Sequence, residues 1–317
     1  MGITFPDWRA ERWVDVPENP LVSPPAGEMP NNVIADPQVI LPGQYNNHWH
    51  MFAWGTPANL YHFSSSDGVT WELIEGWDWP AHPCWLMSWK EEWLLFYSHA
   101  EKVGGTYITI SVRRSNDLKN WSEPVELLRP ELDWEREGPT EFQQVRNPCV
   151  VQMPAGEFRL YYSGGVILLP DTGYVEPKYI SFATATNPLG PYRKLGYPLI
   201  EPSPDIPYRN FGAGAMKVYQ RGDIYIGFNN GIYRDERGRS RSAISLVGSE
   251  DGVHWEDAPF NPIIPPTDGW KKAFVYQLDA KFIPLQNGRE KILLYYNARD
   301  GWEGGIERIG CSVLEPA

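Results

Sequence analysis

Short segments in which hydrophobic and polar positions alternate recur along the whole chain, and they predict β-strands. Each unit of the pattern is a first strand, a polar turn, and a second strand rich in aromatic residues. Alternation and enrichment in β-branched and aromatic residues are typical of strands, and no amphipathic helix of useful length is evident. The predicted pairs are 33–41 with 46–54, 84–89 with 91–99, 145–153 with 156–164, 212–220 with 222–230, and 276–284 with 289–298. Third strands are predicted at 106–115, 178–186 and 240–249.

A second repeat, S-x-D-G-x-x-W, follows some of these strands. It stands at Ser65–Trp71 and Ser249–Trp255, with a looser copy at Ser115–Trp121. Asp-Gly is a pair that favours tight turns. We therefore expect a hairpin tip at each copy, with the tryptophan packed beneath it.

Repetition at a fixed period is the strongest indication of the fold. Five units of roughly fifty residues fill the 317-residue chain, and such repeats are typical of four-stranded blades around a central channel. We predict an all-β fold, a five-bladed β-propeller with four-stranded antiparallel blades, as a single domain over residues 1–317. Residues 13–24 belong to no blade, so we expect them to supply a strand that closes the ring against the last blade.

Composition and charge exclude several classes of partner. A net charge of −12 argues against nucleic acid, which requires a basic face. The chain has three cysteines and no CxxC motif, so we expect the cysteines to be buried free thiols. There is no apolar run long enough to cross a membrane and no signal-like N-terminus, so we expect no membrane association and a cytoplasmic location. The oligomeric state cannot be read from the sequence.

The first strand of each blade in a propeller lines the central channel, so its polar residues are candidates for chemistry. Aligning the five predicted first strands places Asp36, Cys84, Asn147, Gly214 and Asp279 at one level. Charged groups are costly to bury unless they are paired or used. Two carboxylates and an amide at the same height therefore suggest a functional site. The alternative for Asp36 and Asp279 is a structural role in turns or at strand ends.

Two of these segments resemble a known superfamily. Ala35-Asp36-Pro37-Gln38-Val39 is similar to the opening of the five-bladed glycoside hydrolases of families 43, 32, 68, 117 and 130, and Arg146-Asn147-Pro148 is similar to their third-blade Arg-Asp-Pro element. The resemblance implies a glycosidase in which Asp36 acts as base or nucleophile and a second carboxylate acts as general acid.

The general acid is not where the family 43 pattern has it. At the start of the fourth blade, 210–214 contains no carboxylate, and Asn147 replaces the expected third-blade aspartate. Glu141, just ahead of the third channel strand, is the preferred substitute, with Glu137 as its alternative. Asp279, on the blade adjacent to Asp36, is a further candidate.

Other polar and aromatic residues lie at the expected channel mouth and are candidates for binding sugar. Aromatic rings can stack on sugar rings, and an arginine fork can hold carboxylates or hydroxyls. The candidates are Trp54, His82, Trp85, Arg146, Asn147, Tyr276, Gln277 and Arg299. No metal-ligand pattern and no cofactor motif stands out, so we expect neither.

The sequence thus predicts a glycoside hydrolase that cleaves a small oligosaccharide or glycoside by paired-carboxylate chemistry, with exo action favoured by the compact loops. Two alternatives remain open. One is a glycoside phosphorylase resembling family 130, with phosphate held beside Asp36 by Arg146 and Arg299. The other is a carbohydrate-binding propeller without catalysis, which the missing third- and fourth-blade carboxylates favour.

Overall fold

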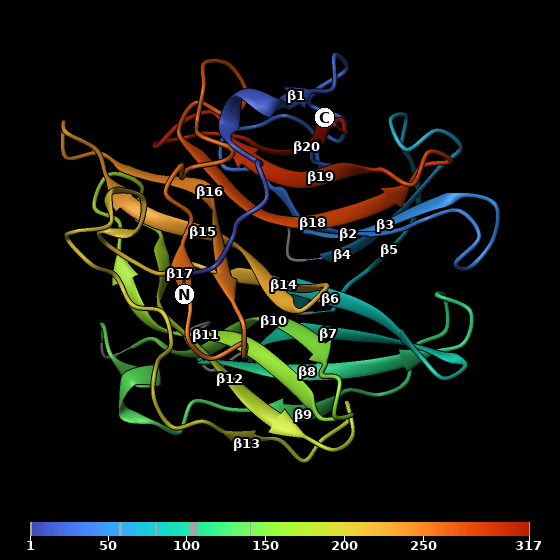
Figure 1. The fold of residues 1–317 in the computed structure, drawn as a ribbon, viewed down its shortest axis with the longest axis horizontal. Helices are drawn as coiled ribbons and strands as arrows, with labels where there is room; N and C mark the ends of the chain where they lie inside the picture. The colour runs from blue at the N-terminus through green and yellow to red at the C-terminus, as the bar shows by residue number, and fades with distance from the viewer. Residues whose placement is uncertain (1, 57–58, 80, 102–106, 140, 317) are drawn as a thin grey trace.

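The fold, seen in a computed structural model, is built almost entirely from β-strands (Figure 1). The structure describes residues 2–56, 59–79, 81–101, 107–139 and 141–316. Within these ranges the only helical segments are three single-turn 3-10 helices, η1 (Ala10–Arg12), η2 (Asp133–Arg136) and η3 (Pro207–Arg209). The predicted all-β class is confirmed. No helix in the described ranges is long and apolar enough to cross a membrane.

The described strands fall into five consecutive antiparallel units. Unit one is β2 (Ile34–Ile40), β3 (Trp49–Gly55), β4 (Asn59–Ser65) and β5 (Glu72–Trp77). Unit two is β6 (Ala81–Trp89), β7 (Glu92–Glu101), β8 (Tyr107–Ser115) and β9 (Val125–Leu128). Unit three is β10 (Gln143–Gln152), β11 (Phe158–Leu168), β12 (Val175–Ala185) and β13 (Arg193–Lys194). Unit four is β14 (Met216–Arg221), β15 (Ile224–Arg234), β16 (Ser240–Ser249) and β17 (Glu256–Asp257). Unit five is β18 (Phe274–Pro284), β19 (Glu290–Arg299) and β20 (Glu307–Leu314), completed by β1 (Trp13–Asp15).

The N-terminal strand joins the two ends of the chain. β1 pairs antiparallel with β20, with Trp13 opposite Leu314, as the sequence predicted for this segment. Short parallel pairings of β8 with β10 and of β16 with β18 link neighbouring units, so that strand pairing groups the units into three sheets.

The repeated S-x-D-G-x-x-W turns form the expected hairpin tips and also join units. In the first copy, the Ser65 hydroxyl accepts a hydrogen bond from the Gly68 N–H (2.9 Å), and the Asp67 carboxylate accepts from two backbone N–H groups (2.8 Å each). The Gly68 carbonyl in turn accepts from the Tyr295 hydroxyl of unit five (2.9 Å). Tyr161 of unit three makes the same bond to Gly252 at the tip of unit four (2.8 Å). Each turn therefore docks one unit against another.

Four of the five first strands carry a β-bulge at equivalent positions, and these bulges position the site. Strand register slips between residues 35 and 38, 81 and 84, 146 and 149, and 275 and 278, so two residues face one on the partner strand. The bulges begin at Asp36, His82, Asn147 and Tyr276. Cys84 and Asp279 lie two and three residues beyond the start of the bulges in β6 and β18. The sequence alignment had placed them level with Asp36, and these two positions were wrong, because the alternating pattern does not show where along a strand the bulge falls.

Candidate active site

A pocket of about 350 Å³ lies where the bulges meet, and all five units contribute to its wall. Its walls include Asp36 from unit one, His82 from unit two, Glu176 from unit three, Gly214 from unit four and Glu307 from unit five. A concave site with convergent polar groups is the usual form of a small-molecule site.

The backbone at Asp36 is held in an unusual conformation. Its φ of 55° lies in the left-handed region, which is uncommon for residues other than glycine. Its N–H donates to the Asn297 side-chain oxygen of unit five (3.0 Å). Its carboxylate accepts a hydrogen bond from the Trp54 indole on the facing strand β3. The bulge, the amide and the indole together fix the direction in which the carboxylate points.

Burial raises the pKa of Asp36 to about 6, although the charges of Lys217 and Arg146 and the Trp54 hydrogen bond oppose this effect. Lys217 is almost fully buried, and its ammonium donates to the carbonyls of Cys84 and Pro148 (3.0 Å each). The carboxylate is thus largely ionised at neutral pH in a poorly hydrated site, with a buried cation nearby.

Two further carboxyls share the pocket with Asp36. Burial raises the pKa of Glu176 to about 7, against the opposing effects of the Arg146 charge and a hydrogen bond with the Tyr276 hydroxyl. Burial raises the pKa of Glu307 to about 8, against the opposing charge of Arg299. Pairs of carboxyls whose surroundings hold them in different protonation states are typical of acid–base sites.

Glu307 is connected to Asp36 through one side chain. The Asn297 amide nitrogen donates to the Glu307 carboxyl, while its oxygen accepts from the Asp36 N–H. Asn297 is almost fully buried, with 1% of its surface exposed. It therefore holds both acidic residues in a fixed relation.

These pKa shifts have a definite consequence for folding. The three carboxyls bind protons more tightly in the folded chain than in the unfolded chain, so their contribution to stability is lost as pH rises through about 6 to 8. His82 and His62, whose pKa values burial lowers to about 4 and about 3, act in the opposite direction below the ordinary imidazole value of 6.5. Above pH 6.5 the three carboxyls determine how the stability of the fold changes with pH.

Two arginines face the pocket from different sides. Arg299 is rigidly held, since its guanidinium donates to the Gly301 carbonyl (3.0 Å) and the Asn31 side chain (2.8 Å) and lies over the Tyr174 ring. Arg146 is half-buried, and among the described residues its guanidinium makes one long contact, with the Asn147 oxygen (3.4 Å). Its guanidinium is therefore the more available of the two for a ligand.

The pocket wall also includes an aromatic corner. The Trp54 and His82 rings lie 5.2 Å apart at 44°. Because burial and the Arg146 charge lower the pKa of His82 to about 4, its imidazole is neutral at pH 7. The corner offers a flat surface and a neutral hydrogen-bonding ring to a ligand.

Most of the residues that the sequence singled out come together here. Those lining the pocket are Asp36, Trp54, His82, Arg146, Asn147, Tyr276, Gln277 and Arg299. Three others do not line it. Glu141 is exposed in the turn before β10, and Trp85 packs in the core beside Lys217 and Tyr219.

Asp279, the third, connects units instead. Its carboxylate accepts hydrogen bonds from the Val39 N–H of unit one (2.6 Å) and the Tyr219 hydroxyl of unit four (3.0 Å), and pairs with Lys281 (2.8 Å). Its side chain is 2% exposed. All of these partners are structural, which is the alternative that the sequence left open for it.

Sequence reasoning did not select Glu176, Glu307 or Asn297. Glu176 lies on β12 and Glu307 at the start of β20, both third strands, whereas the search covered first strands. One signal was present, because Glu176-Pro177 repeats the acid–proline pair of Asp36-Pro37 within a strand-like run. Within the described residues, no group of three or more His, Cys, Asp or Glu side chains is arranged to hold a metal ion.

A search with the sequence finds no matching family model and no matching curated protein. Solved structures match in fold. A putative glycoside hydrolase from Bacteroides ovatus is 13% identical with a TM-score of 0.68, covering 98% of each chain. A structure described under the GH130 family of mannoside phosphorylases, said to contain glycoside hydrolases that target β-1,2 mannosidic linkages in Candida mannan, is 13% identical with a TM-score of 0.67, covering 99% of this chain and 97% of the other.

A third match carries a different description. An N-acetylgalactosamine deacetylase from F. plautii, in complex with blood group B trisaccharide, is 16% identical with a TM-score of 0.63, covering 96% of this chain and 94% of the other. At these identities the matches establish the fold alone, and this fold is shared with structures described as glycoside hydrolases. One fold hosts several chemistries, so function has to be argued from the site.

Proposed function

We propose that the chain is a five-bladed β-propeller that hydrolyses a glycosidic bond in its central pocket. The observation that carries the proposal is the convergence of Asp36, Glu176 and Glu307 on one small cavity. Glycoside hydrolysis requires one ionised and one protonated carboxyl near neutral pH. Five antiparallel units around this pocket, closed by β1 on β20, support the propeller.

Asp36 is the proposed base or nucleophile. It has the lowest pKa of the three carboxyls, about 6, and the Trp54 indole stabilises its ionised form. Its carboxylate therefore carries charge at neutral pH. The first-blade position matches the residue that the sequence resemblance assigned to this role.

Glu176 is the proposed general acid. Its pKa of about 7 is close to a neutral working pH, where a group can both hold and transfer a proton. The Arg146 charge and the Tyr276 hydroxyl oppose the rise that burial causes in the pKa of Glu176. Glu307 has a pKa of about 8 and accepts a hydrogen bond from Asn297. We assign it the role of a protonated, uncharged carboxyl that helps to position Asp36 and Glu176.

The substrate is a glycoside small enough for its terminal sugar to enter the pocket. A cavity of about 350 Å³ lies at the lower end of the range for small-molecule sites. The Trp54–His82 corner supplies an apolar surface, and Arg146 supplies donors for hydroxyl or carboxylate groups. Exo action on a chain end follows from a pocket of this size.

The test is sugar release from a panel of aryl glycosides and oligosaccharides by the native protein and two variants. Asp36→Asn should reduce turnover at least about a hundredfold, since acid–base groups contribute 10²–10⁴-fold. Glu141→Gln is the matched control, because this exposed carboxylate lies outside the pocket and its loss should leave turnover unchanged. Equal turnover by native protein and Asp36→Asn would remove Asp36 from the mechanism.

A phosphorylase is the second candidate, favoured by the two guanidinium groups, Arg146 and Arg299, that face the pocket. The same panel with and without inorganic phosphate separates the two reactions. Release that requires phosphate and yields a sugar phosphate would select the phosphorylase. Binding of glycans with no turnover in either condition would leave the non-catalytic propeller.

A further inference from the structure

Four cationic side chains gather at the edge of units four and five, and we name them the rim cluster. Arg237 and Arg239 lie in the hairpin that joins β15 to β16, Arg241 is on β16, and Lys272 precedes β18. They line a surface hollow of about 600 Å³ together with Trp302. The chain as a whole has a net charge of −12, so four cationic side chains around one hollow give this part of the surface a charge of opposite sign.

Most of the charge of the rim cluster is uncompensated. Arg241 pairs with Asp235 (2.6 Å) and donates to the Lys272 carbonyl (2.9 Å). The described residues provide no ion pair for Arg237, Arg239 or Lys272, whose side chains are exposed. One carboxylate, Asp268, also lines the hollow. Unpaired cations of this kind attract anionic groups of a ligand.

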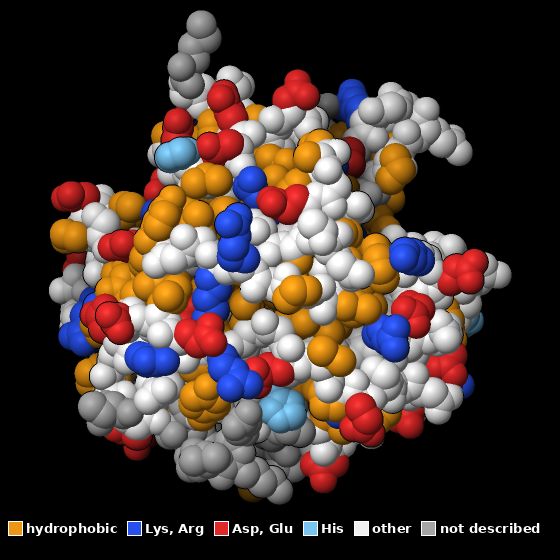
Figure 2. All heavy atoms as spheres, turned by 90° about the horizontal axis from the view of Figure 1, so that it is seen from below, with side chains coloured by type: hydrophobic (Ala, Val, Ile, Leu, Met, Phe, Trp, Pro, Cys, Tyr) orange, Lys and Arg blue, Asp and Glu red, His pale blue; other side chains and the backbone are white. Residues whose placement is uncertain are grey.

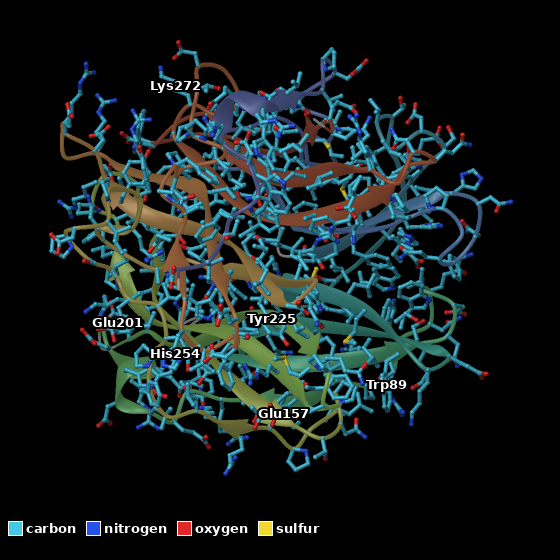
Figure 3. The ribbon with its side chains drawn as sticks, viewed as in Figure 1. Trp89, Glu157, Glu201, Tyr225, His254 and Lys272 are labelled. Carbon is cyan, nitrogen blue, oxygen red and sulfur yellow. The ribbon has the colours of Figure 1, made fainter. Side chains whose placement is uncertain are left out.

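Lys272 lies at the periphery of the molecule, on the loop before β18 (Figure 3). The face shown in Figure 2 differs, because there Lys and Arg side chains lie interspersed with Asp and Glu.

Trp302 fixes two of the guanidinium groups in place. Arg239 and Arg241 lie over its ring, 4.7 Å and 5.0 Å from the centroid. The ring itself is held because its N–H donates to the Ser240 carbonyl (2.7 Å). Donors that are already ordered lose less entropy when they bind a ligand. The rim cluster is thus a preorganised group of donors on the surface.

The rim cluster adjoins the central pocket through a continuous row of aromatic rings. Trp302 meets Phe274 edge-on with centroids 6.5 Å apart, and Phe274 stacks on Tyr276 at 5.3 Å. Tyr276 is part of the pocket wall.

A second connection runs through the hairpin that joins β11 to β12. Its Asp171 accepts from the Ser240 N–H (2.7 Å), and its Tyr174 lines the pocket. The rim cluster and the pocket are therefore joined by two independent sets of contacts.

We propose that the rim cluster binds the carboxylate or sulfate groups of an anionic glycan whose terminal sugar occupies the central pocket. This inference rests on the proposed function and names its substrate class. Guanidinium forks match both oxyanions in two-point hydrogen bonding, and Lys272 adds a point charge. A short anionic glycan suits this surface better than nucleic acid, because the remainder of the chain is acidic and would repel a long polyanion that extends beyond the rim cluster.

The test is direct binding, measured by calorimetry with the native protein at low and moderate salt. The probes are oligogalacturonates and oligoglucuronates for carboxylate, sulfated galactose oligosaccharides for sulfate, and neutral oligosaccharides of the same lengths. The test variant is Arg239→Ala/Lys272→Ala. The matched control is Lys90→Ala/Arg193→Ala, which removes two exposed cations elsewhere, including one that lies over Trp89 (4.1 Å) as Arg239 lies over Trp302. Trp89 lies far from Lys272 in Figure 3.

We expect an anionic probe to bind more tightly than its neutral counterpart, with about tenfold weaker binding in the test variant and no change in the control. The advantage should shrink at higher salt. Tighter binding of the uronate probe or of the sulfated probe identifies whether the rim cluster recognises carboxylate or sulfate. Lys272→Glu, which alters one exposed side chain, should weaken anionic binding as well and guards against misfolding of the double variant.

Three results would overturn the inference. They are equal binding of anionic and neutral probes, unchanged binding in the test variant, and equally tight binding of a short single-stranded DNA. Because the assay requires no turnover, its outcome is separate from that of the proposed function. Cluster-dependent binding without sugar release would refute hydrolysis alone, whereas Asp36-dependent release with no anionic preference would refute the rim cluster alone.

Discussion

The hydrogen bond from Trp54 to Asp36 allows a quantitative prediction. Trp54→Phe keeps an aromatic ring in the pocket but removes the indole N–H that donates to the Asp36 carboxylate. That bond stabilises the ionised form and lowers the pKa of Asp36 towards its value of about 6. Its loss should therefore raise the pKa of Asp36.

The magnitude follows from the strength of such bonds. A hydrogen bond to a charged group is worth about 1.5–3 kcal/mol, and about 1.4 kcal/mol corresponds to one pH unit. Trp54 is half-buried at a pocket that water can enter, so the lower end of this range applies. The acidic limb of the pH profile of kcat/KM should move up by about one pH unit. Activity should fall about twofold at pH 7 and about tenfold at pH 5.

The assay is kcat/KM for one aryl glycoside between pH 4 and pH 9. Trp71→Phe is the control, since Trp71 packs beneath a hairpin tip and its indole N–H has no hydrogen-bond partner among the described residues. A Trp54→Phe profile that is lowered equally at every pH would show that the ring only binds sugar. An unchanged acidic limb with reduced activity would refute an ionised Asp36 as the reacting group.

Three further predictions concern stability and the shape of the site. Between pH 6.5 and 8, native stability should fall in urea unfolding, and Glu307→Gln should lessen that fall by about 1–2 kcal/mol; parallel slopes would contradict the raised pKa. Asp279→Ala should cost about 3 kcal/mol, because it leaves buried donors unpaired, and Asp279→Asn should stay active once folded; an inactive, well-folded Asn variant would return Asp279 to the mechanism. Gly214→Ala should reduce both stability and activity, since φ is 65° and a Cβ would lie 2.0 Å from a backbone oxygen, whereas Gly156→Ala, with φ of 86° and open space, should cost only about 1 kcal/mol. Equal costs at the two glycines would contradict the close approach at Gly214.

The strands were predictable because each carries its own signal. The segment 33–41 was predicted and β2 spans Ile34–Ile40; 276–284 was predicted and β18 spans Phe274–Pro284. The second first strand was predicted from residue 84 but begins at Ala81, and the fourth was predicted from residue 212 but begins at Met216. Here Gly214 adopts a positive φ that interrupts regular pairing. Alternation reports burial, and it does not report backbone dihedral angles.

The site was only partly predictable, for reasons of geometry. Asp36 was recognisable because it is an acid within an apolar first strand, and first strands were expected to line the channel. Glu176 and Glu307 reach the same pocket from third strands, and only the three-dimensional arrangement shows that these approach it. Asp279 has the same sequence signal as Asp36, but it lies beyond the bulge in β18, where its carboxylate meets Val39 and Tyr219. Asp36 and Asp279 therefore lie in different environments although the sequence pattern around them is the same.

The most direct test of the account is the activity of Glu176→Gln on two substrates that differ only in their leaving group. Protonation by a general acid is needed for a sugar leaving group and is unnecessary for dinitrophenolate, which leaves as a stable anion. We predict that kcat/KM of Glu176→Gln falls at least about a hundredfold for the oligosaccharide and less than about tenfold for the dinitrophenyl glycoside. Equal losses on both substrates, or no loss on either, would contradict the assignment of Glu176 as the acid partner of Asp36.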